Sequence, residues 1–462
     1  MAMLPQALLL VLLFHTGVAS SSSIINTLPG FFGDLPFKLE TGYVGVGDLD
    51  EVQLFYYFAE SEGSPEHDPL MLWLSGGPGC SGFHAFVYGS VGSLSFDYAE
   101  SGYNKPKLKL NPYSYTKVAN VIFLDAPVGT GFSYAKTWKG YTNMSATSYA
   151  AQTYQFLKKW FLDHPKFLNN PLYIGAESYS GIVLPIVVKE ISDGNEEGDE
   201  PPMNLKGYVL GNAGCDSKKD MSYTVPFSHL KALISDELYQ STKRNCNENY
   251  TDVDPSNVLC LDDMELVNEC VEDINPAHIL EPKCTYSSPN HLSNKHSVNL
   301  LLPFSQLPRQ WCRKDNYIFS EVWANDKAVQ NALHIREGTI KEWVRCNKSL
   351  SASYIHDVSS SLVYHEYLIK KGYRVLVYSG DQDMMVPYLG TIDWIESLNL
   401  NVTFPWKPWL VNGQVAGYRV QYTYEKYHLT FTTIKGAGHV APEYKPEECL
   451  AMVRRWFAYD PL

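Results

Sequence analysis

Short, uninterrupted apolar runs, each followed by turn residues, limit this chain more than any other feature. The runs cover residues 70–74, 121–124, 172–174, 208–210, 375–378 and 430–434. Strands that are apolar on both faces suit the centre of a parallel sheet that is covered on both sides. Helical patterns, clearest at 145–163 and 326–334, lie between the runs. The alternation therefore predicts an α/β protein with a mostly parallel central sheet.

The middle of the chain has a different character. From Cys215 to about residue 320 the sequence is polar, helical and rich in cysteine, and strand-like runs resume after it. We therefore expect one domain over 23–462 with an insertion at about 215–320, and not two separate domains. In an α/β enzyme, an insertion of this kind tends to cover the mouth of the active site.

The N-terminus has the pattern of a secretory signal peptide. An apolar stretch over residues 7–14 is too short to span a bilayer, and small residues follow it over 17–23. We expect a signal peptide over 1–22; the alternative is a buried N-terminal helix. Acceptor triplets for N-glycosylation begin at Asn143, Asn249, Asn347 and Asn401. Together these features predict the secretory pathway, with the vacuole or the extracellular space as the destination.

Charge and cysteine content exclude several classes of protein. The net charge of −13 over 462 residues leaves no basic surface for nucleic acid or for an acidic membrane. The 9 cysteines form no CxxC pair, and no histidine stands at the spacing of a zinc ligand, so disulfides are expected and a metal is not. No cofactor is predicted. The odd number of cysteines leaves at least one thiol unpaired or in an intermolecular bond.

The residues that follow the apolar runs carry the chemistry. In open α/β sheets, functional residues gather at the carboxyl ends of the strands. The segments found there are SGGPGCS after residue 74, Ser178 after 174, SGDQD after 378 and KGAGH, which ends at His439, after 434. Alone, each has a common structural explanation: a tight turn, a helix cap or a packed loop histidine. Together, the order Ser…Asp…His matches that of α/β-hydrolases.

These residues suggest a serine nucleophile with a complete set of helpers. Ser178 needs a base to accept its proton, and the imidazole of His439 can serve near neutral pH. A carboxylate must orient that imidazole, and we favour Asp383 over Asp381 because it stands at the far end of its loop. The backbone N–H groups of Gly77 and Tyr179 are the candidate donors to an oxyanion.

The motifs SGGPGCSG, DAPVGTGFSY, AESYSG, WANDKAVQNALHI, SGDQDMMVP and GAGHVAPE together resemble those of the serine carboxypeptidases. The resemblance runs from about Leu35 to the C-terminus. It implies an α/β-hydrolase fold with a helical, disulfide-containing lid insertion, and an acyl-serine intermediate. The cysteine pairs that it implies are Cys80–Cys346, Cys246–Cys260 and Cys284–Cys312.

Peptidases of this family hold the carboxylate of a peptide with an asparagine before GGPG and a pair of glutamates. This chain has Ser75 at the asparagine position and keeps one glutamate as Glu177, while Gly89 or Ser90 stands where the second is expected. A peptide C-terminus would lose hydrogen bonds that its burial requires. With Gly76, the residues Ser75, Glu177 and Ser90 are the candidate substrate contacts.

The strings WLSGGPGCSG, GDQDMMVPYLGT and APEYKPEEC resemble the plant acyltransferase branch of the family instead. That branch moves an acyl group, often phenolic, from a 1-O-acyl glucose ester to an acceptor hydroxyl. The chain departs from the branch at Glu177, Ala176 and Val440, where aspartate, glycine and threonine are usual. The resemblance favours an acyltransferase, which can act alone or in homo- or hetero-oligomers. One alternative is a carboxypeptidase or esterase. The other is a non-catalytic partner of a related acyltransferase.

Overall fold

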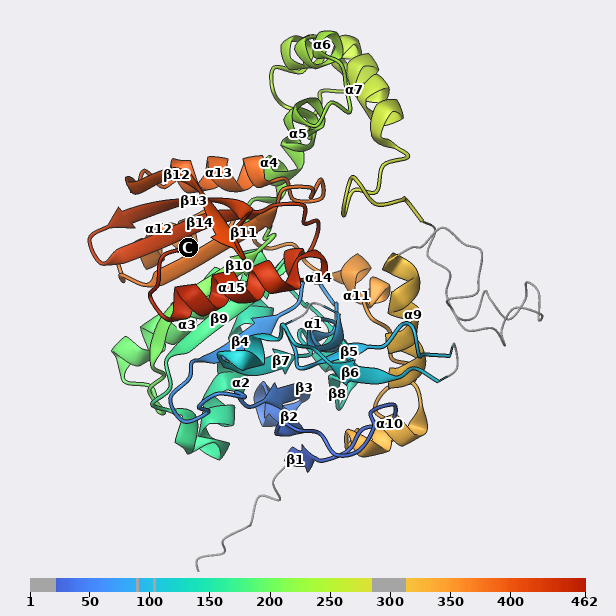
Figure 1. Ribbon diagram of the computed structural model, residues 1–462, viewed down its shortest axis with the longest axis vertical. Helices are drawn as coiled ribbons and strands as arrows, with labels where there is room; N and C mark the ends of the chain where they lie inside the picture. The colour runs from blue at the N-terminus through green and yellow to red at the C-terminus, as the bar shows by residue number, and fades with distance from the viewer. Residues whose placement is uncertain (1–21, 89–90, 103–104, 285–312) are drawn as a thin grey trace, which may run out of the picture.

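A large mixed sheet forms the centre of the molecule in the computed structural model, which describes residues 22–88, 91–102, 105–284 and 313–462 (Figure 1). Its central strands, in spatial order, are β7 (Asn120–Leu124), β4 (Leu70–Leu74), β9 (Leu172–Glu177), β10 (Leu205–Gly211), β11 (Arg374–Gly380) and β14 (Tyr427–Ile434). Every neighbouring pair in this series is parallel. Each apolar run of the sequence lies within one of these strands, so the predicted α/β fold with a mostly parallel sheet is confirmed.

Antiparallel strands extend the sheet at both edges. On the β7 side these are β3 (Val52–Ala59), β2 (Leu39–Val46), β1 (Ser22–Ile25) and the short β8 (Tyr134–Ala135). On the β14 side they are β13 (Gln414–Tyr424) and β12 (Asn401–Val411). A separate pair, β5 (Leu94–Phe96) and β6 (Leu108–Leu110), lies outside the sheet.

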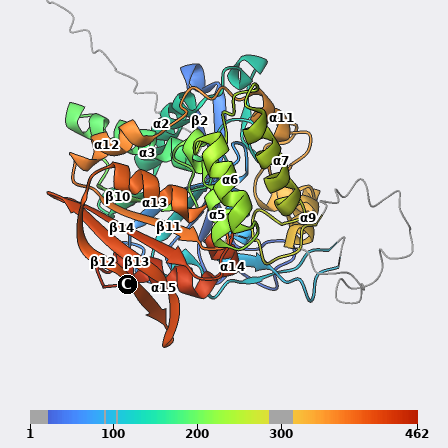
Figure 2. The same cartoon turned by 90° about the horizontal axis from the view of Figure 1, so that it is seen from above.

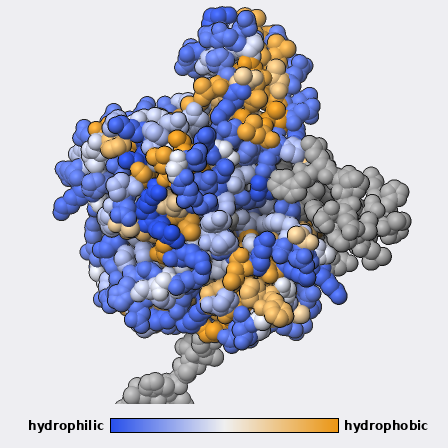
Figure 3. Space-filling model, viewed as in Figure 1, coloured by the Kyte–Doolittle hydropathy of each residue, from blue (hydrophilic) through white to orange (hydrophobic). Residues whose placement is uncertain are grey.

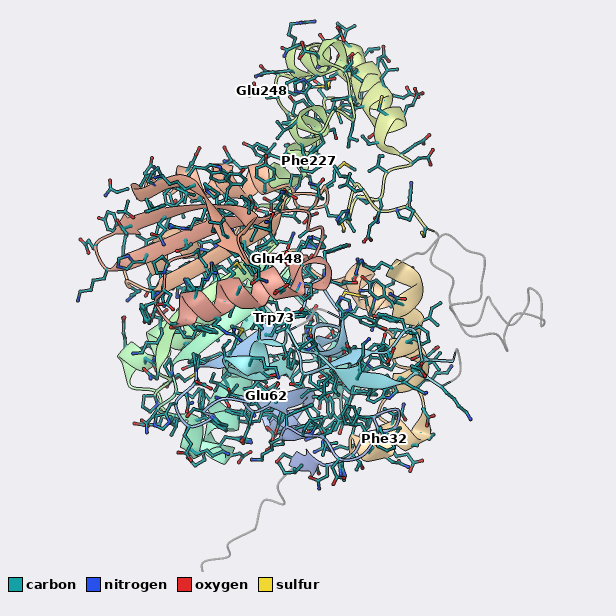
Figure 4. All side chains as sticks on the ribbon, in the orientation of Figure 1. Phe32, Glu62, Trp73, Phe227, Glu248 and Glu448 are labelled. Atoms are coloured by element: carbon teal, nitrogen blue, oxygen red, sulfur yellow. A yellow bond between two sulfur atoms is a disulfide. The ribbon has the colours of Figure 1, made fainter. Side chains whose placement is uncertain are left out.

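Two hydrophobic cores, one on each face, explain why the central strands are apolar throughout. Along β4, Leu70, Leu72 and Leu74 join one core, whereas Met71 and Trp73 join the other. The first core contains residues of α2 (Ala146–Asp163), α3 (Ser180–Glu197), α12 (Leu362–Ile369) and α13 (Tyr388–Ser397). The second contains residues of α1 (Gly82–Val87), α9 (Arg313–Ala324), α10 (Lys327–Ala332) and α15 (Pro446–Phe457). Figure 4 shows Trp73 in the middle of the molecule, close to α15.

Helix caps explain where the two most regular sequence patterns begin. Ser145 accepts a hydrogen bond from the N–H of Ser148 at the start of α2, and Asp326 accepts one from Ala328 at the start of α10. Both helices begin one residue after the start of the predicted pattern. Among the described residues, no helix has the length and apolar character that crossing a membrane requires.

The chain between β10 and β11 is helical, and part of it projects from the body (Figures 1 and 2). The helices of this stretch not yet given are α4 (Ser217–Ser222), α5 (Thr224–Leu230), α6 (Asp236–Cys246), α7 (Val258–Val271) and α11 (Lys348–Ser353), and the short α14 (Ala441–Tyr444) follows β14. Phe227 and Glu248 mark the base and the outer part of this projection in Figure 4. It has a small core of its own around the Cys246–Cys260 disulfide. Its surface carries exposed apolar side chains of α7, such as Leu259 (Figure 3).

Candidate active site

Ser178 occupies a sharp turn between β9 and α3. Its φ angle is 56°, in the left-handed region that residues other than glycine seldom adopt. Its N–H donates to the carbonyl of Gly211 on β10, and its own carbonyl accepts from Gly181 and Gly214. These bonds hold the strained turn in place, as is typical of a nucleophile at a strand-to-helix junction.

The structure brings Ser178, His439 and Asp383 together from three strand ends. The Nε2 atom of His439 lies 2.8 Å from the Oγ of Ser178, and its Nδ1 atom lies 2.7 Å from an Oδ of Asp383. Asp381, the alternative carboxylate, instead accepts from the N–H of Gly436 at 2.7 Å. The geometry is that of a Ser–His–Asp relay, with Asp383 as its carboxylate.

Asp383 is fully buried, and both of its oxygens are bonded. One accepts from the N–H groups of Met385 and Val386, at 2.8 and 3.0 Å. The other accepts from His439 and, at 2.8 Å, from the side-chain amide of Asn212. These donors fix the carboxylate in orientation.

Asn212 is a site residue that the sequence reasoning missed. Its side-chain amide also donates to the carbonyl of Gly438, and its side-chain oxygen accepts from the N–H of Ala441. It thus links the Asp383 side chain to both sides of His439. The sequence contains the signal that marks the other site residues, because Asn212 directly follows the strand β10.

Two opposing effects act on the pKa of His439: burial and the carboxylate of Asp383. Burial disfavours the charged imidazole, but the charge and hydrogen bond of Asp383 outweigh it and raise the pKa of His439. An imidazole with a raised pKa accepts the serine proton more readily.

The candidate oxyanion donors, the N–H groups of Gly77 and Tyr179, flank Ser178. Within the described residues neither N–H donates a hydrogen bond, so both are available to a ligand. Gly76 packs against the nucleophile, since a Cβ atom there would lie 2.5 Å from the Cβ of Ser178. A side chain at position 76 would displace the serine.

Two anchors fix the glycine-rich loop. The Cys80–Cys346 disulfide ties it to a segment 266 residues further along the chain. The buried Asp125 accepts from the Oγ of Ser81 at 2.5 Å and from the N–H of Gly82 at 2.8 Å. Burial raises the pKa of Asp125 to about 7, although these donors oppose the shift. Asp125, which belongs to the DAPVGTGFSY motif, thus holds the glycine-rich loop in place through hydrogen bonds.

Two residues near Ser178, at the ends of neighbouring strands, carry polar atoms without partners within the described residues. The Oγ of Ser75 and one carboxyl oxygen of Glu177 are buried and unbonded within the described residues. These residues follow paired positions on β4 and β9, where Leu74 is opposite Ala176. Burial raises the pKa of Glu177 to about 7, and the charge of His439 opposes the shift. Ser90, the remaining candidate contact, lies outside the described residues.

Three further groups near the site were not found from the sequence. Burial lowers the pKa of His84 well below its usual value, and its Nδ1 has no partner among the described residues. Burial raises the pKa of Glu443, against the charge of Arg313. Arg345 lies over the ring of Tyr317 at 4.2 Å, and within the described residues it forms no ion pair. Glu443 ends the motif GAGHVAPE, whereas no quoted motif contains His84 or Arg345, and only the fold brings the three residues to the site.

The expected disulfides Cys80–Cys346 and Cys246–Cys260 are present. Cys284 is also disulfide-bonded, but its expected partner Cys312 lies outside the described residues, so that pairing stays a prediction. Among the described cysteines, Cys215, Cys270 and Cys449 are free.

The glycosylation triplets differ in their surroundings. Asn143, Asn249 and Asn401 are exposed. Asn347 is half-buried; its side-chain nitrogen donates to the carbonyl of Gly129 at 2.8 Å, and its oxygen caps α11. Within the described part of the chain, no cluster of acidic, histidine or cysteine side chains is suited to a metal ion.

Comparisons with known proteins agree with this geometry. The model of the serine carboxypeptidase family matches residues 29–459. Serine carboxypeptidase-like 17 of Arabidopsis thaliana is 46% identical over 455 residues, which cover 98% of this chain and 97% of the relative. Serine carboxypeptidase-like 9 of the same plant is 42% identical over the whole of both chains.

A solved structure shares the fold. A prohormone-processing carboxypeptidase from Saccharomyces cerevisiae superimposes with a TM-score of 0.74 at 20% identity, covering 94% of this chain and 95% of its own. This likeness supports the α/β-hydrolase fold. With the family model and the plant relatives, it leads to one conclusion: the chain belongs to the serine carboxypeptidase family.

Proposed function

We propose that this protein is an acyltransferase that moves a phenolic acyl group from a 1-O-acyl glucose ester to an acceptor hydroxyl. Ser178 attacks the ester carbonyl while His439 takes its proton. The bond from the acyl carbon to glucose breaks, and His439 returns the proton to the departing sugar oxygen. In the second half, His439 takes the proton of the acceptor hydroxyl, which attacks the acyl-serine. The bond from the acyl carbon to the Oγ of Ser178 then breaks, and His439 returns the proton to that oxygen.

Each tetrahedral intermediate carries a negative oxygen. The N–H groups of Gly77 and Tyr179 are the proposed donors to it, and one such donor is worth roughly 3–4 kcal/mol of transition-state stabilisation. Asp383 keeps the imidazole oriented and stabilises its charged form. These steps are common to hydrolysis and transfer, so they do not by themselves decide between the two.

The observation that carries the proposal is the set of groups beside Ser178. Ser75 offers a hydroxyl, and Glu177, with a pKa of about 7, is largely protonated at mildly acidic pH. Both have a buried polar atom without a partner within the described residues. Neutral donors and acceptors suit the hydroxyls of a sugar leaving group, because those hydroxyls bring no charge into a buried site.

A carboxypeptidase is the second candidate. Arg345 favours it, because a guanidinium without an ion pair among the described residues suits the carboxylate of a peptide. Ser75 opposes it, since a single hydroxyl replaces the two donors of an asparagine amide. We give the acyltransferase precedence because the glutamate pair of the peptidases is incomplete here.

The route of the protein is inferred from its cysteines. Disulfides form and persist in oxidising compartments, and the Cys80–Cys346 bridge lies beside the proposed site. We propose passage through the secretory pathway to the vacuole or the extracellular space. Glycan mapping of the purified protein tests this, with Asn143, Asn249, Asn347 and Asn401 as the expected attachment sites.

The test of the reaction compares transfer with peptide cleavage. The glycosylated protein is incubated with 1-O-(4-hydroxybenzoyl)-glucose and a panel of alcohols, and separately with N-blocked dipeptides. Products are followed by mass spectrometry, with Ser178→Ala as the control. Ester transfer that is absent from the control supports the proposal.

Two other outcomes contradict it. Dipeptide cleavage without ester transfer would establish the carboxypeptidase alternative. Inactivity in both assays, with restored activity of a related acyltransferase when the two are mixed, would establish a non-catalytic partner.

A further inference from the structure

A segment of the helical insertion crosses the two loops that carry Asp383 and His439. We call this segment, residues 275–281, the strap. The N–H of His439 donates to the carbonyl of Ala277 at 2.6 Å. On the other loop, the N–H of Met384 donates to the carbonyl of Pro276 at 2.9 Å. The strap therefore bonds to the backbone of His439 itself and to the residue after Asp383.

Further contacts join the strap to both loops. The N–H of Ile279 donates to the carbonyl of Gln382 at 3.2 Å. The Nδ1 of His278 accepts from the N–H of Leu280, so its Nε2 carries the proton and donates to the carbonyl of Gly436 at 3.2 Å. A Cβ atom at Gly438 would lie 2.2 Å from the carbonyl oxygen of Ala277. The strap thus contacts the histidine loop through hydrogen bonds and through close packing at Gly438.

Arg313, the first residue of α9, joins the strap to the chain that follows His439. Its Nη2 and Nε atoms bond both carboxyl oxygens of Glu281, at 2.7 and 3.1 Å. Its Nη1 donates to the carbonyl of Glu443 at 3.2 Å, and its guanidinium lies 4.1 Å from the ring centre of Tyr444. The side chains of Arg313 and Glu281 are only 20% and 16% exposed. A two-pronged pair in this setting has a defined geometry.

We infer that Arg313 is a positioning residue: by holding the strap against the loop of His439, it keeps the imidazole between Ser178 and Asp383. The physical reason is that small displacements at a reacting centre cost large factors in rate. The strap restrains His439 through its backbone, whereas Asp383 restrains it through its side chain. This role goes beyond the proposed function, since it applies to any reaction that passes through Ser178.

The test measures the reactivity of Ser178 without reference to a substrate. The rate of covalent labelling by a fluorophosphonate depends on the serine and its histidine, and it is independent of the acyl donor. We expect Arg313→Gln to slow labelling by roughly 10–100-fold. Arg313→Lys, which keeps the charge and loses the fork, should show an intermediate rate. If transfer were disproved but labelling followed this pattern, the inference would stand while the proposed function fell.

Two controls separate positioning from a general loss of structure. Lys117→Gln breaks another partly exposed ion pair, with Glu62, away from the strap, and should label at the wild-type rate. The double exchange Glu281→Arg with Arg313→Glu restores the pair with its charges reversed and should recover a good part of the labelling rate. The low-field proton signal of the His439–Asp383 hydrogen bond should weaken in Arg313→Gln at an unchanged melting temperature.

Two results would overturn the inference. One is labelling of Arg313→Gln at the wild-type rate. The other is slow labelling that falls in step with the melting temperature and does not recover in the double exchange. If Arg313→Gln does not fold, Glu281→Gln breaks the same pair from the strap, and wild-type labelling there also overturns the inference.

Discussion

The two sides of Ser178 differ in how far their polar groups are satisfied. On the catalytic side, Asp383 is buried and both of its oxygens accept hydrogen bonds. On the substrate side, Ser75, His84 and Glu177 each keep a buried polar atom without a partner within the described residues. Ser75 and Glu177 lie at the carboxyl ends of strands, as Asp383 and His439 do, so position at a strand end alone does not cause the difference.

The difference indicates which side a ligand completes. A buried polar group without a partner costs about 1–3 kcal/mol, so such groups are uncommon unless something binds them. The catalytic side is complete before the substrate arrives. A substrate can supply partners to the polar atoms that the substrate side leaves unbonded within the described residues.

The largest effect is expected from the catalytic side. Replacing Ser178 with alanine removes the nucleophile and should reduce turnover by roughly 10⁴-fold or more. Because its neighbours stay in place, the variant should still bind the acyl glucose. Turnover and equilibrium binding, measured on the same preparation, check both halves of this expectation. A variant that keeps a tenth of the activity would contradict the proposed nucleophile.

Asn212 should rank second. Replacing it with alanine removes a donor to Asp383 and the bonds to Gly438 and Ala441, which hold the histidine loop. We expect kcat to fall by roughly 10–100-fold with KM nearly unchanged, since the residue does not face the substrate side. Steady-state kinetics of the proposed transfer measure this split. A rise in KM at constant kcat would contradict this expectation and assign Asn212 to substrate binding.

The sequence predicts the centre of this fold well because strands buried on both faces leave a clear apolar pattern. The run at 70–74 became β4 without a change of bounds. The β14 side of the sheet is harder to predict, because β12 is largely exposed and neither β12 nor β13 carries a continuous apolar run. β13 pairs with β14, which lies after both strands in the chain.

The candidate site divides in the same way. Ser178, Asp383 and His439 each stand just after an apolar run, so their convergence follows from a property of parallel sheets. His84, Arg345 and Glu443 lie on helices and loops outside that pattern. Their meeting depends on how the helices pack on the sheet, which neither spacing nor periodicity reveals.

A change at Glu177 should have the third-largest effect, and it should mainly alter KM and not kcat. Replacing it with alanine removes the neutral donor and acceptor that we propose as a contact of the leaving sugar. We expect KM for the acyl glucose to rise by roughly 5–20-fold while kcat stays within a factor of a few. Donor-dependent kinetics with a saturating acceptor measure both constants. A large fall in kcat alone would show that Glu177 belongs with the catalytic side.

The smallest effect is on stability, and it depends on pH. Burial raises the pKa of Glu177 to about 7, whereas the unfolded chain has the ordinary glutamate value of about 4.3. Between these values the folded protein binds a proton that the unfolded chain has released. The stability that this group contributes is therefore fully present below the unfolded pKa and is lost as pH rises towards about 7.

Glu177→Gln should lack this dependence. Relative to the wild type, its unfolding free energy should improve by about 2–3 kcal/mol between pH 4.5 and 7.5, as urea unfolding measures. Glu60 is the matched control: its bonds to Lys166 and Lys38 lower its pKa despite burial, so its contribution is lost as pH falls. Glu60→Gln should therefore change the pH profile in the opposite direction. If wild type and Glu177→Gln had parallel profiles, Glu177 would be ionised and already partnered, and the contrast between the two sides of Ser178 would lose its main support.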